Sequence, residues 1–310
     1  MEDFSEIGAI WRGETRRALR SGRVLVLLIL FLLFVGLALT AVGWLNHLAN
    51  VNFEQQMSMA GADLGQARAE LTATKKKILQ AVVTDDEAML DSLAAIPIVL
   101  LVVFKLTLRF LPLFIALMGF DQLAGEVGPK SVRYLVVRVK RNSIILGKLL
   151  SQITLFGILM SICTVMMVLV SRALNADFAA PDVALWTVKL VISSMVLSLA
   201  YLSLTALFSA LVKQGGISLV LNVIALFVIW FVALIGGAVR FPGEEAAQGT
   251  LAMLKAESAW AYMRYASVWQ YGDDLLHPHW GRFLPAALVH VGFALVFLGL
   301  AHLALKWRDL

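Results

Sequence analysis

Long stretches without a charged residue constrain this chain more than any other feature of its sequence. Five of them, at 24–45, 149–170, 190–212, 217–239 and 283–305, exceed the roughly 18 apolar residues that mark a membrane span. About 20 helical residues, at a rise of about 1.5 Å each, cross a hydrocarbon core of roughly 30 Å. The 310 residues are 60% apolar and 15% charged, whereas soluble domains average roughly 45–50% and about 25%. A soluble globular protein is therefore excluded.

A sixth stretch, 96–120, is long enough to cross a membrane but contains Lys105 and Arg109. The apolar pieces on either side of these residues are each too short to cross alone, so the whole stretch counts as one span. We therefore predict an all-α polytopic membrane protein with six transmembrane helices in a single transmembrane domain, residues 24–310. The predicted spans are 24–45, 96–120, 147–170, 189–212, 217–239 and 283–305.

Lysine and arginine residues are concentrated in the connections on one side of these spans. Short loops rich in these residues stay on the cytoplasmic side of a membrane. With six spans, the N-terminal segment, the loop at 121–146, Lys213, Lys306 and Arg308 all fall on that side. Both termini are therefore predicted to be cytoplasmic, and we expect a bacterial inner membrane. The formal net charge of +5 follows no periodic stripe, so no nucleic-acid partner is expected.

Residues 1–23 are predicted to form a cytoplasmic amphipathic helix ahead of the first span. Five apolar side chains share one side of this helix, and charged residues occupy the other: Phe4, Ile7, Trp11, Ala18 and Leu19. We predict an interfacial helix that lies along the membrane lipid of the cytoplasmic leaflet, with its arginines near the phosphates. A helix surrounded by water is the alternative.

Two long loops, 46–95 and 240–282, fall on the opposite, outer side. In the first, apolar residues recur near a helical period, which predicts amphipathic helices that extend the adjoining spans outward or pair across a dimer. The second is rich in tryptophan and tyrosine, which favour the boundary between membrane and water. We expect short interfacial or re-entrant helices there.

Lys105 and Arg109 lie four residues apart and therefore on one face of the second span. A basic residue near the middle of a bilayer costs about 2.5–3.5 kcal/mol on insertion scales. No Asp or Glu occupies a predicted span, so a partner would have to come from a loop or a second subunit. One interpretation is a polar patch that faces a substrate path or a dimer interface. The other is a tilted span that lets both side chains reach the membrane surface.

The loop at 121–146 has apolar residues at helical spacing, interrupted by Gly128-Pro129. This pattern predicts short helices, each with one apolar side. A short helix presented to the cytoplasm is suited to docking in a groove of a partner protein. The alternative is a basic loop that only sets the topology.

The loop that joins the second and third predicted spans carries a series of characteristic residues. The series is Asp121, Glu126-Val-Gly128, Ser131, Arg133-Tyr134-Leu135, Arg141 and Gly147-Lys148, and the N-terminal segment adds Glu14 and Arg20-Ser21. Together with the six-span plan and the amphipathic start, it resembles the ABC-2 type transporter permeases, the membrane subunits of ATP-binding-cassette (ABC) exporters. The family often has Gly-Thr-Leu where this chain has Pro129-Lys130-Ser131, and Pro where it has Val139.

The resemblance implies a separate ABC ATPase subunit that binds ATP and Mg²⁺, and a second permease copy in a homodimer. It also implies that 121–146 is the coupling-helix loop that contacts the ATPase. The contact residues carried over are Glu126, Gly128, Ser131, Arg133, Tyr134, Leu135 and Arg141. This chain itself lacks a P-loop, because Asn142 stands where its first glycine should be and Leu149 follows Gly147-Lys148. No cofactor and no metal are expected in this chain.

The resemblance favours an exporter permease that performs no covalent chemistry. An alternative keeps the ATPase but replaces transport with mechanotransmission, in which 46–95 relays motion to an extracytoplasmic partner. A membrane-embedded enzyme is disfavoured, because the predicted spans contain no Asp pair, Ser-His constellation or metal cluster. The substrate is not specified by the fold, because one scaffold serves many functions.

Overall fold

A computed structural model describes residues 2–60, 73–80, 90, 93, 96–127, 140–174, 180–238, 263–277 and 279–307. Within these residues the regular elements are helices, with no strand. The long helices are α1 (Glu2–Arg20), α2 (Gly22–Ala60), α5 (Ile98–Gly119), α8 (Arg141–Leu174), α9 (Ala180–Leu211), α10 (Gly215–Ala238) and α12 (Trp280–Lys306). The short ones are residues 73–80, α6 (Ala124–Val127) and three 3₁₀ turns, η2 (Met263–Ala266), η3 (Val268–Tyr271) and η4 (Asp274–Leu276).

Six of the described helices are long and apolar enough to cross a membrane, which confirms the predicted number of spans. They are Val24–Leu48, Ile98–Gly119, Asn142–Ala173, Val183–Leu211, Gly215–Ile235 and Trp280–Lys306. The α2 helix continues well past its apolar part, because the sequence has neither Pro nor Gly between residues 46 and 60 to end it. The outer loop predicted to begin at residue 46 therefore begins as a continuation of the first span.

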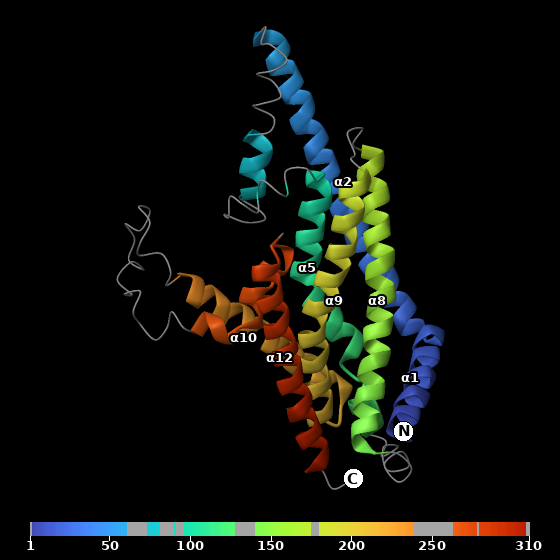
Figure 1. The fold of residues 1–310 in the computed structure, drawn as a ribbon. Coiled ribbons are helices and arrows are strands. Elements are labelled where there is room, and N and C mark those ends of the chain that lie inside the picture. The colour runs from blue at the N-terminus through green and yellow to red at the C-terminus, as the bar shows by residue number, and fades with distance from the viewer. Residues whose placement is uncertain are drawn as a thin grey trace.

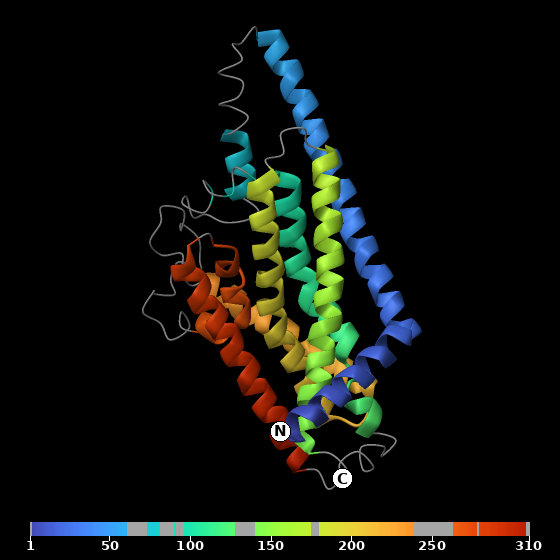
Figure 2. The ribbon, with the colours of Figure 1, turned by 45° about the vertical axis from the view of Figure 1, so that its right-hand side comes forward.

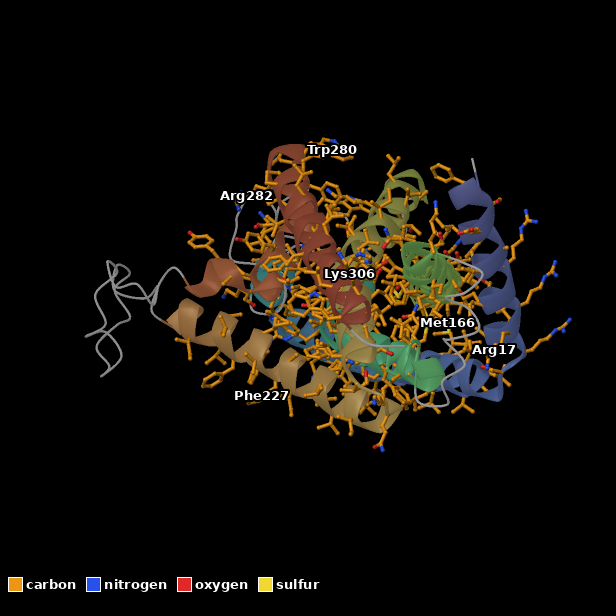
Figure 3. The ribbon with its side chains drawn as sticks, turned by 90° about the horizontal axis from the view of Figure 1, so that it is seen from below. Arg17, Met166, Phe227, Trp280, Arg282 and Lys306 are labelled. Atoms are coloured by element: carbon orange, nitrogen blue, oxygen red, sulfur yellow. The ribbon has the colours of Figure 1, made fainter. Side chains whose placement is uncertain are left out.

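Helix α9 is the centre of the bundle. It packs against α5, α8, α10 and α12, and 67% of its most apolar stretch is buried, against 17% for α10. Figure 1 shows α5, α8 and α9 running alongside one another, while α10 is steeply inclined to them and extends away from the bundle. In the view from below, Phe227 of α10 lies on the side away from Arg17 of α1 (Figure 3).

Both α1 and the final turn of α12 lie at the same end of the bundle, as six spans require (Figures 1 and 2). We call this the terminal end, and the opposite end, where α5 and α12 begin, the loop end. Which end faces the cytoplasm remains a prediction from the charge distribution.

Helix α1 lies across α8 at the terminal end (Figure 2). Trp11 donates its indole N–H to the Thr154 hydroxyl at 2.9 Å, and the Thr15 hydroxyl donates to Ser151 at 3.0 Å. Part of the predicted apolar face is thus covered by protein. Phe4 and Leu19 remain 82% and 57% exposed, so the proposed contact of this helix with lipid stays a prediction.

Candidate functional site

Residues 263–277, which we call the re-entrant segment, fold back against α5, α9, α10 and α12. The segment contacts α5 at Arg109, which lies about 16 Å along the helix axis from Ile98 at the loop end. Figure 1 shows this segment next to α10 and beside the beginning of α12. The predicted short helices of 240–282 are present here as three 3₁₀ turns, and residues 240–262 lie outside the described part.

The re-entrant segment supplies a partner for Lys105. The Lys105 ammonium forms an ion pair and hydrogen bond with Oδ1 of Asp273. Lys105 is 12% exposed and Asp273 is 65% exposed at the side chain, so the lysine is the desolvated member of the pair. A loop of the same chain therefore provides a compensating charge for Lys105.

Arg109 contacts the same segment one helical turn further along. Its guanidinium carbon lies 4.8 Å from the centre of the Trp269 ring, a cation–π distance. Such contacts contribute about 0.5–2 kcal/mol, depending on how far the cation is removed from water. Both basic residues of the second span thus contact the re-entrant segment.

Helices α9 and α10 hold the backbone of this segment. The Lys189 ammonium donates to the His277 carbonyl, and Ser193 donates to the Leu275 carbonyl at 2.7 Å. On the other side, Ser267 donates to the Ile229 carbonyl of α10 at 2.8 Å. Because 3₁₀ turns leave backbone groups without helix partners, such donors are needed for irregular backbone inside a membrane.

A small cavity of about 30 Å³ lies between α5, α9 and the re-entrant segment. Its polar lining comes from Lys105, Arg109, Tyr201, Trp269 and Asp273. Two cations beside one carboxylate in so small a space would suit a small anion or a water molecule. In the described part of the chain, no three His, Cys, Asp or Glu side chains are grouped for a metal ion.

The second candidate site is the loop predicted to contact an ATPase. Gly128, Ser131, Arg133, Tyr134 and Leu135 lie outside the described residues. Glu126 belongs to α6 and Arg141 opens α8, and only the backbone is described for both. The contacts predicted for these seven residues therefore stay predictions.

The beginning of this loop is seated on the turn between α9 and α10. The Ser209 hydroxyl oxygen accepts hydrogen bonds from the backbone N–H groups of Leu123 and Ala124, at 2.8 and 2.9 Å, and so caps α6 from another helix. Gly215 approaches the loop so closely that a Cβ there would lie 2.7 Å from Cβ of Asp121. Close contact at both ends of this turn fixes the position of the loop relative to α9 and α10.

The end of the loop leads into a contact between α8 and α1. Lys148 is buried, and its ammonium pairs with Oε1 of Glu14 at 3.0 Å. A Cβ at Gly147 would lie 2.8 Å from Cβ of Ile10, so only glycine allows this approach without a shift. Gly147-Lys148 therefore contacts helix α1.

A known protein family matches this chain over most of its length. The chain matches the model of the family described as ABC-2 family transporter protein over residues 9–310. The chain belongs to the ABC-2 transporter family. No curated protein sequence matches it. It is thus a multi-pass membrane protein and a permease component of an ABC transporter, from a family whose members are generally non-catalytic and work with an ABC ATPase.

Sequence reasoning did not find several residues that organise the two sites of this ABC-2 permease. Asp273 and Trp269 were not identified as the partners of Lys105 and Arg109, and Ser209 and Gly215 were not singled out. For Asp273 and Trp269, the available signal was that the predicted spans contain no carboxylate, so that Lys105 and Arg109 required a partner from elsewhere.

Replacing Ser209 by alanine in this permease should lower the free energy of unfolding by about 2 kcal/mol, because two buried N–H groups lose their acceptor. Ser203→Ala is the matched control: Ser203 is also buried on α9 but donates only to the Leu199 carbonyl of its own helix, at 2.8 Å. Thermal unfolding in detergent would measure both variants. Equal losses would contradict the role of Ser209 as a cap for α6.

Proposed function

We propose that this permease couples ATP hydrolysis by a separate ABC ATPase to the export of a substrate, acting as a homodimer in a bacterial inner membrane. The loop at 121–146 is the ATPase contact in this proposal. The observation that carries it is the seating of both ends of that loop, by Ser209 and Gly215 on one side and by Gly147 and Lys148 on the other.

A displacement of this loop would be transmitted along α9. Ser209, which caps the loop helix α6, and Ser193, which holds the re-entrant segment, are on the same helix and lie about 24 Å apart along its axis. A rigid helix that contacts both sites supports the idea that movement at one is felt at the other. In this mechanism the ATPase moves α9, and α9 moves the wall of the cavity at Lys105 and Arg109.

The ATPase contact is tested by Glu126→Gln and Arg133→Gln, made separately. We expect each to weaken assembly with the ATPase by about tenfold, or about 1.4 kcal/mol, because a charged interface group is lost. Co-purification with the ATPase and ATP turnover would measure the effect. Lys213→Gln is the control, because Lys213 is an exposed basic residue outside that loop. Normal assembly and normal turnover in both loop variants would overturn the proposal.

A second candidate function is mechanotransmission without transport. It is favoured by α2, whose 39 residues continue to Ala60, beyond the apolar part that ends at Leu48. Directional uptake of substrate into vesicles that contain the permease and its ATPase would distinguish the two functions. Uptake supports the exporter, whereas an outer partner bound through 46–95 without uptake supports mechanotransmission.

A further inference from the structure

Arg109 carries a charge at the middle of the second span, and its guanidinium has no hydrogen-bond acceptor within the described part of the chain. Arg109 lies about 16 Å along α5 from Ile98 and about 15 Å from Gly119. The hydrocarbon core is roughly 30 Å thick, so the lipid phosphates are distant on both sides. Arginines reach these phosphates from the ends of a helix rather than from its middle. This depth favours an anion that binds inside the membrane.

The contact with Trp269 leaves most of the Arg109 guanidinium available. Its Cζ lies 4.8 Å from the centre of the Trp269 ring, and the side chain is exposed. One ring covers only one side of a guanidinium, whose five N–H donors point outward in its plane. The free edge of Arg109 can therefore donate two parallel hydrogen bonds to a carboxylate.

The other charges of the small cavity are not available to a ligand. Lys105 and Asp273 line this cavity and are paired with each other, so we assign no ligand contact to either. The pair is neutral as a whole and leaves the charge of Arg109 uncompensated. The cavity of about 30 Å³ beside Arg109 has room for about one water-sized group. An anionic group could enter it, but the rest of a larger ligand must lie outside.

The surface of α5 next to Arg109 is apolar. Phe110 and Leu113 are both exposed, and Leu113 lies one helical turn from Arg109 on the same face. The Phe110 ring contacts Phe34 of α2, with 5.2 Å between the ring centres, so the apolar surface continues towards α2. A small soluble anion would lose its water on entering this place and gain no apolar contact. An anion with a long apolar part is complementary to both the charge and the surface.

We propose that Arg109 binds the carboxylate of an amphiphilic anion, with the chemistry of a long-chain fatty acid. The carboxylate accepts hydrogen bonds from the edge of the guanidinium, at the mouth of the small cavity, and the chain covers Phe110 and Leu113. The binding itself is independent of transport. Only the further step, that this anion represents the class of exported substrate, rests on the proposed function.

The test is photolabelling of the full permease in nanodiscs of phosphatidylcholine, without the ATPase, at pH 8.5. Carboxylic acids ionise well below this pH. The two probes are hexadecanoic acid and hexadecanol, each with a diazirine at the same position in the middle of the chain. Mass spectrometry would identify the labelled peptides. We expect the acid to label residues 98–119 of α5 about fivefold more than the alcohol, or about 1 kcal/mol in affinity.

Variants of Arg109 test the role of its charge and shape. Arg109→Gln should remove the preference for the acid. Arg109→Lys should keep part of it, because the charge remains but the two parallel donors are lost. Arg172→Gln is the matched control and should keep the full preference, because Arg172 is an exposed arginine in the last turn of α8.

Three outcomes would overturn the proposal. The first is equal labelling of the unaltered chain by the acid and the alcohol, which requires no variant and would indicate that water surrounds Arg109. The second is an unchanged preference in Arg109→Gln. The third is dissociation of a homodimer in Arg109→Gln, which would identify a carboxylate of a second copy as the anion. Labelling that depends on Arg109, without ATP-driven uptake of the acid into vesicles, would contradict only the proposed export.

Discussion

Replacing Asp273 by leucine should lower the free energy of unfolding by about 2 kcal/mol and the melting temperature by roughly 4–8 °C. Breaking a fully buried ion pair costs about 3–5 kcal/mol, and we expect less here because Asp273 is 65% exposed at its side chain. Most of the lost stability should come from Lys105, because its charge is only 12% exposed and would lose the Asp273 carboxylate. Thermal unfolding of the purified protein would measure the change.

The double variant Lys105→Leu, Asp273→Leu is the control for this prediction. It removes both charges, so its stability should be at least partly restored relative to Asp273→Leu alone. A double variant as unstable as the sum of the two single variants would contradict direct coupling between the residues. Because the double variant should remain folded, its transport activity also tests the cavity. Loss of transport there, and in Arg109→Leu, would support a substrate path, whereas full activity would exclude it.

Replacing Gly215 by alanine should reduce ATPase assembly and coupled ATP turnover by about tenfold while the spans remain folded. The new Cβ would lie 2.7 Å from Cβ of Asp121 and 3.1 Å from the Phe120 ring, so the turn between α5 and α6 must move. Overpacking of this kind typically costs about 1–3 kcal/mol. The loss should appear in assembly because the displaced turn carries the start of the coupling-helix loop.

Gly216→Ala is a closely matched control, because a Cβ at the neighbouring glycine would have no atom within 4 Å. Both substitutions add one methyl group in the first turn of α10, so their effects on helix propensity should be similar. Co-purification with the ATPase would compare them. Equal assembly by Gly215→Ala and Gly216→Ala would contradict the proposed seating of the loop.

The six spans could be predicted because the thickness of a bilayer sets a minimum length for every apolar helix that crosses it. The same rule could not predict where each helix ends. Hydropathy marks the limit of the hydrocarbon core, whereas α2 continues to Ala60 and α8 begins at Arg141 because no Pro lies in either extension to break the helix. Helix α1 was predicted as amphipathic, and its packing on α8 could not be, because an apolar face does not specify what covers it.

For the candidate sites, the sequence could identify at most one residue of a contact and not the residue that it contacts. Lys105 and Arg109 were identified because charges within a span are costly, but Asp273 is 168 positions away from Lys105, and no spacing rule connects them. Ser209 gave no signal at all, because serines in membrane helices commonly bond to their own backbone, as Ser203 does. Its contact with the N–H groups of Leu123 and Ala124 exists only once α9 and the loop are assembled.

Helix α2 has a mechanical consequence. Its 39 residues make a continuous rod about 58 Å long, and it joins α1 through the short break at Ser21. Phe31 and Phe34 of this rod pack on Phe114 and Phe110 of α5, so the two helices would tilt together, and a tilt of about 10° carries Ala60 through about 10 Å relative to Ser21. A small adjustment of α1 against α8 at the terminal end would thus become a large displacement beyond the opposite face of the membrane.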